Sequence, residues 1–260
     1  MSVWYDVHGE GPGVALVHAG VADSRMWEPQ LEAFSAAHTV LRVDLPGFGR
    51  SPLESNEVSN RGSVREALDA AGIDRAALVG VSLGGATVLE LAIESPERVT
   101  ALVLVGTGLA GHEWSDEVEA FGAEEEEAFE RGDLDAAVEA NLRIWLAGPH
   151  RTLDAIDPSV RDLVAEMQRH SFELWKGHDD VRALRLEPPA SERLAEVRMP
   201  TLVVTGDEDV RDIHDIADKL SAEIPGVQRA TIADAAHLPS LERPDEFNRI
   251  VLDFLADHEA

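Results

Sequence analysis

The segment LVGVSLGGAT, residues 78–87, places Ser82 in the pattern G-x-S-x-G. A run of apolar residues precedes the serine and a helical pattern follows it. In such a strand–turn–helix a serine sits on a sharp, strained turn, and the small residues Gly80, Gly84 and Gly85 leave room for that turn. The pattern is short and also occurs by chance in glycine-rich turns. We therefore predict a nucleophile at Ser82 only if the rest of the chain supplies its partners.

A serine hydroxyl needs a general base near neutral pH, and histidine has a pKa suited to that role. Of the ten histidines, His237 lies in a loop after the last apolar run and before the C-terminal helical pattern. The carboxyl ends of parallel strands meet at one edge of a sheet, so this loop can reach Ser82. The segment VVTGDEDV offers Asp207, Glu208 and Asp209 at the end of another strand, and one of these carboxylates would fix the histidine tautomer.

Two segments are expected to supply backbone N–H groups for an oxyanion. The N–H of Leu83, at the start of the helix after Ser82, would point at the oxygen of an acyl group on the serine. The segment VHAGV follows an earlier strand and offers the N–H of Gly20 or, failing that, of Val21. The alternative interpretation is an ordinary strand end at which His18 has a structural role.

Short apolar runs alternate with helical patterns along the chain. Several of the runs are continuously apolar and rich in Val and Leu, as in parallel strands buried on both faces. The predicted strands are residues 14–18, 39–44, 76–81, 100–106, 201–206 and 227–232, and the helical patterns between them include residues 63–72, 86–96 and 212–224. This alternation predicts an α/β fold with a doubly wound, mostly parallel sheet.

One block interrupts the alternation, because residues 110–194 carry helical patterns and no strand signal. We predict a core domain made of residues 1–109 and 195–260, with residues 110–194 inserted as a helical cap that is not an independent domain. Aromatic side chains near the predicted site suggest an apolar substrate body, although ordinary core packing is equally compatible: Trp27, Trp114, Trp145, Phe172 and Trp175. The run EEEE at 124–127 is expected to be a solvated helix face, with an interaction patch as the alternative.

Composition excludes several classes of function. The chain of 260 residues has 50 acidic and 22 basic residues and a formal net charge of -28, which disfavours binding to nucleic acid or to anionic membranes. It has no cysteine, and therefore no disulfide, zinc thiolate or cysteine nucleophile. No segment approaches the roughly 20 apolar residues of a membrane span, and the N-terminus lacks the pattern of a signal peptide. We expect a cytoplasmic protein.

Taken together, these motifs resemble those of the α/β-hydrolase fold family, and of its cofactor-independent serine hydrolases in particular. The resemblance runs through VHAG, VDLPGFGRS, LVGVSLGG, PERVTALVLVG, TLVVTGDED and AAHLPSLERPDEF, in that order. It implies a sheet of about seven strands, with the cap inserted after the sixth standard strand of the fold. It also implies that Asp209 is the catalytic acid, with Asp207 as the fallback, and that neither a cofactor nor a metal is needed.

The residue at the turn selects the reaction. Relatives that carry aspartate there are epoxide hydrolases or haloalkane dehalogenases, and dienelactone hydrolases carry cysteine, so Ser82 disfavours these chemistries. The resemblance implies a small-molecule hydrolase of the enol-lactonase or carboxylesterase type that cleaves a partly apolar ester or lactone. The same triad also suits a C–C bond hydrolase of vinylogous diketones or a perhydrolase. A hydrolase-fold ligand receptor is the alternative that is not an enzyme.

Overall fold

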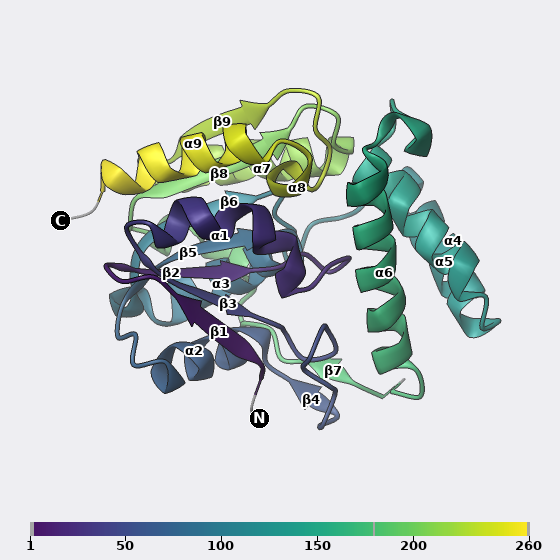
Figure 1. The fold of residues 1–260 in the computed structure, drawn as a ribbon, viewed down its shortest axis with the longest axis horizontal. Helices are drawn as coiled ribbons and strands as arrows, with labels where there is room; N and C mark the ends of the chain where they lie inside the picture. The colour runs from purple at the N-terminus through teal and green to yellow at the C-terminus, as the bar shows by residue number, and fades with distance from the viewer. Residues whose placement is uncertain (1–2, 179, 259–260) are drawn as a thin grey trace.

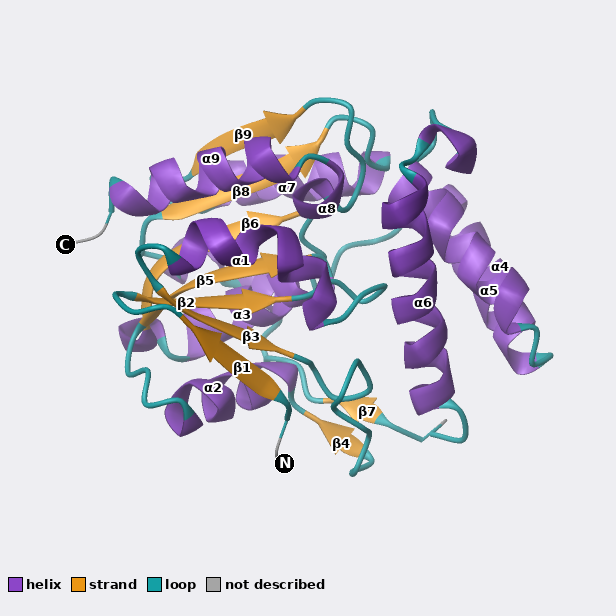
Figure 2. Ribbon diagram, in the orientation of Figure 1, coloured by secondary structure: helices purple, strands orange, loops and turns teal. Residues whose placement is uncertain are grey.

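A seven-stranded sheet lies at the centre of the structure, a computed structural model that describes residues 3–178 and 180–258 (Figures 1 and 2). The strand order is β1-β3-β2-β5-β6-β8-β9, and β1 is antiparallel to β3 while all other neighbours are parallel. The strands are β1 (Tyr5–His8), β2 (Gly13–Val17), β3 (Thr39–Val43), β5 (Ala76–Val81), β6 (Val99–Val105), β8 (Thr201–Gly206) and β9 (Gln228–Ile232). The predicted strands are confirmed to within a residue or two at their ends.

Helices cover both faces of the sheet, because successive side chains along each buried strand point to opposite sides. On one face, Ala15 and Val17 of β2 belong to the apolar core beneath α2, α3 and α7. On the other face, Val14 and Leu16 belong to the core beneath α1 and α9. The helices of these layers are α1 (Glu28–Ser35), α2 (Asn60–Ala70), α3 (Leu83–Glu94), α7 (Arg211–Glu223), α8 (Pro239–Glu242) and α9 (Pro244–Ala256).

Helix α2 begins three residues before the predicted pattern. The Ser59 side chain accepts a hydrogen bond from the Gly62 N–H, which caps the helix. The apolar periodicity starts only after this polar first turn, so it could not mark the beginning of the helix.

Three helices follow β6 and precede β8 in the sequence, and they lie beyond the carboxyl ends of the central strands (Figure 1). They are α4 (Asp116–Glu130), α5 (Leu134–Asn141) and α6 (Pro158–Trp175), and a π-helical segment at Leu142–Ala147 extends α5. The same region also contains β7 (Arg182–Ala183), which pairs in parallel with β4 (Glu57–Val58). The prediction that residues 110–194 contain no strand was therefore wrong. A two-residue strand is too short to produce a periodic signal.

In the two ranges that the structure describes, no helix is long and apolar enough to cross a membrane.

Candidate active site

Ser82 occupies the turn between β5 and α3 in a strained backbone conformation. Its φ of 53° and ψ of -111° lie in a region that non-glycine residues rarely adopt. The turn is held in place by the Ser82 N–H, which donates a hydrogen bond of 2.8 Å to the carbonyl of Val105 on the neighbouring strand. Strain of this kind persists only where the surrounding structure fixes it, and it is typical of functional turns.

The glycines around Ser82 are required by close backbone approach. A Cβ atom at Gly80 would lie 2.3 Å from the carbonyl oxygen of Gly84, and one at Gly84 would lie 2.2 Å from that of Val17. At Gly85 the obstacle is the Thr107 hydroxyl, 2.4 Å away. This is the small-residue turn predicted from the sequence.

Replacing Gly84 with alanine is expected to destabilise the fold by about 3 kcal/mol, because backbone atoms must move to accept the new methyl group. The matched control is Gly122→Ala, since a Cβ there meets nothing within 4 Å and Gly122 lies inside α4. This control is expected to stabilise the protein by up to about 1 kcal/mol through helix propensity. Urea unfolding of both variants measures the difference, and equal stabilities would refute the steric explanation.

His237 and Asp209 form a buried pair. The ring Nδ1 of His237 lies 2.9 Å from Oδ2 of Asp209, and both side chains are almost fully buried. The other carboxylate oxygen of Asp209 accepts a hydrogen bond of 2.8 Å from the Val210 N–H, so the carboxylate is fixed in orientation. Asp207, the fallback for the acid, is exposed on the same turn.

The other ring nitrogen of His237 is available for chemistry. This Nε2 atom is buried and has no hydrogen-bond partner among the described residues. It belongs to a residue that lines the same cavity as Ser82. A carboxylate on Nδ1 favours the tautomer in which Nδ1 carries the proton and Nε2 is an acceptor.

A π-helical segment places Trp145 against His237. The two rings have centroids 4.5 Å apart, and the backbone N–H of His237 donates a hydrogen bond of 3.2 Å to the backbone carbonyl of Trp145. π-helical turns are rare and occur frequently at functional sites. The residue periodicity of this region predicts an ordinary helix, so the contact was not foreseen.

Arg151 and Glu242 join the inserted helices to the loop that carries His237. Arg151 donates hydrogen bonds to the carbonyls of Leu146 and Asp234, and pairs with Glu242 at 2.6 Å. Glu242 in turn accepts a hydrogen bond from the backbone N–H of Ala236, the residue directly before His237. Burial raises the pKa of Glu242, against the charge and hydrogen bond of Arg151. These two residues support the loop and were missed by the sequence analysis.

The predicted oxyanion segments lie side by side. A Cβ at Gly20 would be 3.6 Å from the Leu83 side chain, and Gly20 and Val21 both line the cavity that contains Ser82. The N–H of Leu83 stands in the first turn of α3, where a backbone donor has no acceptor within its own helix.

His18 has a structural role beside the oxyanion segments. Its Nδ1 lies 2.8 Å from the Ala19 carbonyl, and its Nε2 accepts the Leu45 N–H at 2.9 Å. Burial lowers the pKa of His18, so the ring stays neutral and anchors the loop.

Two cavities meet at Ser82. One, of about 320 Å³, is mainly apolar and is lined by Ser82, Leu83, Ala86, Gly108, Leu109, Ala110, Gly111, His112, Trp114, Trp145 and Arg185. The other, of about 220 Å³, is lined by Gly20, Val21, Ser82, Glu125, Asn141, Trp145, Gln168 and His237. Trp145 lines both, and its role in substrate binding stays a prediction.

Three of the predicted substrate-binding aromatics do not line these cavities. Trp27 has no exposed surface and packs against Phe247 in the core, with ring centroids 6.1 Å apart. Phe172 packs against Phe129, and Trp175 fills the space beside Gly47. These three predictions are corrected. An aromatic side chain that packs against another helix or loop looks the same in the sequence as one that lines a cavity.

The sequence analysis missed three polar residues of the smaller cavity, Glu125, Asn141 and Gln168. Glu125 belongs to the run EEEE, and the prediction of a solvated face is wrong for this residue, which is half-buried. Burial raises the pKa of Glu125, and a hydrogen bond from Asn141 opposes that shift. Successive residues of a helix point in different directions, so one of four consecutive glutamates faces the protein interior. A run of like charges in the sequence does not show which one.

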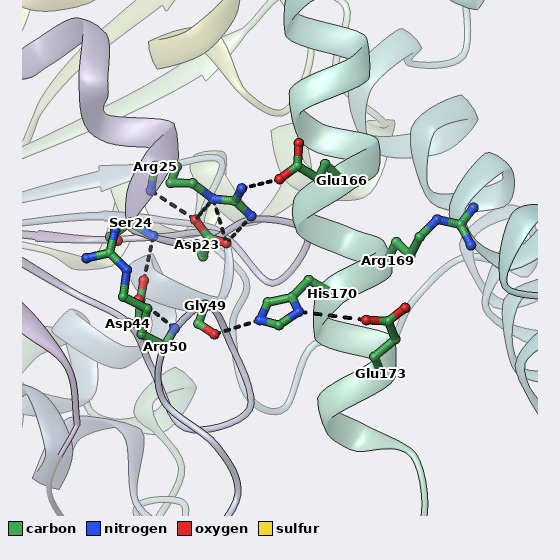
Figure 3. Close-up of a pocket in the computed structure, with 10 residues that line it drawn as sticks. All are labelled: Asp23, Ser24, Arg25, Asp44, Gly49, Arg50, Glu166, Arg169, His170 and Glu173. Carbon is green, nitrogen blue, oxygen red and sulfur yellow. Dashed lines mark hydrogen bonds and ion pairs between the residues drawn. The ribbon is translucent and has the colours of Figure 1, made fainter.

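A third cavity, of about 430 Å³, lies between the loop after β2 and helix α6, and Ser82 does not line it. Figure 3 shows Arg25 between Asp23 and Glu166, and His170 of α6 directed at the carbonyl of Gly49. The polar groups of this cavity are largely paired with one another. We interpret the charged and polar pairs around this cavity as the contact that holds α6 against the loops after β2 and β3.

We expect Asp23 to make the free energy of unfolding depend on pH in the acidic range. Burial alone raises its pKa, but hydrogen bonds from Arg25 outweigh that effect and hold the pKa below its ordinary value. An aspartate whose pKa is lower in the folded than in the unfolded protein stabilises the fold fully at pH values above its unfolded-state pKa of about 3.9. This stabilisation declines below that pH and is lost as the pH falls through the folded-state pKa. Asp23→Asn should therefore reduce the free energy of unfolding by about 1 to 3 kcal/mol at neutral pH, and by less below about pH 4.

Urea unfolding at neutral pH and at about pH 3.5 tests this expectation, with the exposed Asp154→Asn as control. A deficit in Asp23→Asn that stays constant across this pH range would contradict the assignment.

Comparison with known proteins places these features in a family. Residues 12–244 match the model of the alpha/beta hydrolase fold. The chain is 26% identical to a carboxylesterase of Bacillus subtilis, over 95% of this chain and 81% of the relative. It is 30% identical to a 2-hydroxy-6-oxononadienedioate/2-hydroxy-6-oxononatrienedioate hydrolase of Comamonas testosteroni, over 96% and 89% of the two chains. The enol-lactonase of Burkholderia xenovorans superposes with a TM-score of 0.81 at 25% identity, covering 98% of this chain and 96% of its own.

Proposed function

This chain belongs to the alpha/beta hydrolase fold family and is a hydrolase, and on that basis we propose that it cleaves a carboxylic ester or lactone through an acyl-enzyme on Ser82. The observation that carries the proposal is the position of the His237 ring between Asp209 and the cavity that Ser82 lines. Its Nδ1 is held by the buried Asp209, and its Nε2 is unpartnered among the described residues, in the cavity that Ser82 lines.

The proposed reaction uses these residues in turn. Ser82 Oγ attacks the substrate carbonyl and gives its proton to Nε2 of His237, while the N–H groups of Gly20 and Leu83 stabilise the oxyanion. The bond to the leaving oxygen then breaks, and His237 returns the proton to that oxygen. Water attacks the acyl-enzyme by the same steps, releasing the acid and free Ser82. Asp209 orients the His237 ring and stabilises the imidazolium that forms in each half-reaction.

A substrate panel tests the bond that is cleaved. We expect turnover of p-nitrophenyl butyrate and of five- or six-membered lactones, because a triad with a backbone oxyanion site stabilises the tetrahedral intermediate of acyl transfer. Activity on a vinylogous diketone combined with none on any ester or lactone would overturn the ester assignment.

A C–C bond hydrolase is the second candidate. Its support is the similarity to the Comamonas testosteroni hydrolase, whose dienedioate and trienedioate substrates are dicarboxylic acids. In this chain Arg185 lines the larger cavity together with Ser82, and its guanidinium lies 3.9 Å from the Glu90 carboxylate. It brings a positive charge to that side of the cavity.

A further inference from the structure

The smaller cavity beside Ser82 lies on the side where the leaving group departs. It contains His237, and the nitrogen that returns the proton to the leaving oxygen must lie next to that oxygen. The larger cavity is lined by Ser82 and by Leu83, Leu109 and Trp114 but not by His237. If Ser82 forms the acyl-enzyme proposed above, the acyl body occupies the larger apolar cavity and the alcohol occupies the smaller one.

The smaller cavity contains an unpartnered acceptor and a carboxyl group, and no lysine or arginine among the described residues that line it. Gln168 is 4% exposed, and its Oε1 has no hydrogen-bond partner among the described residues. Glu125 adds a carboxyl group, and the amide nitrogen of Asn141 donates a hydrogen bond of 3.2 Å to the Ala137 carbonyl. Among the described side chains that line this cavity there is no lysine or arginine.

We propose that this cavity selects alcohol leaving groups that donate hydrogen bonds, such as a hydroxyl-bearing alcohol, and rejects leaving groups that carry a carboxylate. A hydroxyl on the leaving group can donate to Gln168 Oε1 or to Glu125, which satisfies a buried acceptor that is otherwise unpaired. A carboxylate would be desolvated beside Glu125 with no cation to pair with it.

Three butyrate esters that differ only in the alcohol test the proposal: n-propyl butyrate, 2-hydroxyethyl butyrate and carboxymethyl butyrate. Butyrate release in a pH-stat gives kcat/KM for each ester, divided by its rate of alkaline hydrolysis to remove differences in intrinsic reactivity. The wild type should favour the hydroxyethyl over the carboxymethyl ester by about tenfold, because the carboxymethyl ester both loses the donated hydrogen bond and brings an unpaired charge beside Glu125.

Glu125→Gln should reduce this ratio to about threefold or less, because it removes the negative charge while keeping the shape of the side chain. Glu126→Gln is the matched control, since it removes the same charge from the adjacent, exposed position and should keep the wild-type ratio. Gln168→Met should lower kcat/KM for the hydroxyethyl ester toward that of the propyl ester without improving the carboxymethyl ester.

The inference is overturned if the wild type uses both polar esters equally, if Glu125→Gln retains the wild-type ratio, or if none of the three alkyl esters is cleaved while p-nitrophenyl butyrate is. Failure of the proposed function itself would give a different experimental result. In that case p-nitrophenyl butyrate itself shows no hydrolysis that depends on Ser82, and both proposals fail.

Discussion

Ser82→Ala is expected to reduce kcat for p-nitrophenyl butyrate by about 10³-fold or more, with little change in stability. The serine supplies the only bond between protein and acyl group in the proposed reaction, and alanine cannot form it. The residual rate would reflect binding and the backbone donors alone, because the oxyanion site and the cavities remain in place.

Ser63→Ala is the control for this variant. Ser63 is a buried serine of α2 that lines neither cavity at Ser82, and its replacement should leave kcat within about twofold of the wild type. Equal rates for Ser82→Ala and the wild type would show that hydrolysis does not pass through this residue.

Asp209→Asn is expected to lower kcat by about 10⁴-fold. The amide retains the shape of the side chain, but it favours the wrong tautomer of His237 and cannot stabilise the imidazolium. The contact of 2.9 Å between Asp209 and Nδ1 of His237 carries this expectation.

Asp207→Asn distinguishes the two acids offered by the same turn. Asp207 is exposed, so its amide variant should keep nearly full activity. A large loss in Asp207→Asn with little loss in Asp209→Asn would reverse the assignment of the acid.

The fold and the proximity of the candidate residues were largely predictable because the carboxyl ends of buried parallel strands meet at one edge. Buried runs rich in Val and Leu located β5 and β8, and the alternating segment at residues 227–232 located β9. The order of the chain then placed Ser82, the acidic turn and His237 at that edge. Choosing Asp209 over Asp207 needed the family resemblance. Neighbouring residues on a turn differ in the direction of their side chains, and residue type alone does not encode that direction.

The cavity was less predictable, because burial of polar and aromatic groups depends on how the inserted helices pack. Trp27 and Trp145 are indistinguishable by residue type, yet one packs in the core and the other covers His237. Glu125 and Gln168 come from different helices, α4 and α6, so no local pattern joins them. The π-helical segment that presents Trp145 also leaves no signature in the apolar periodicity.

Labelling of the nucleophile tests the central claim most directly. Diisopropyl fluorophosphate should add one phosphoryl group per chain, peptide mass spectrometry should locate it on Ser82, and ester hydrolysis should fall in proportion to the label. Ser82→Ala should remain unlabelled. A label on another residue, or full hydrolysis by a protein whose Ser82 is completely modified, would contradict the proposed mechanism.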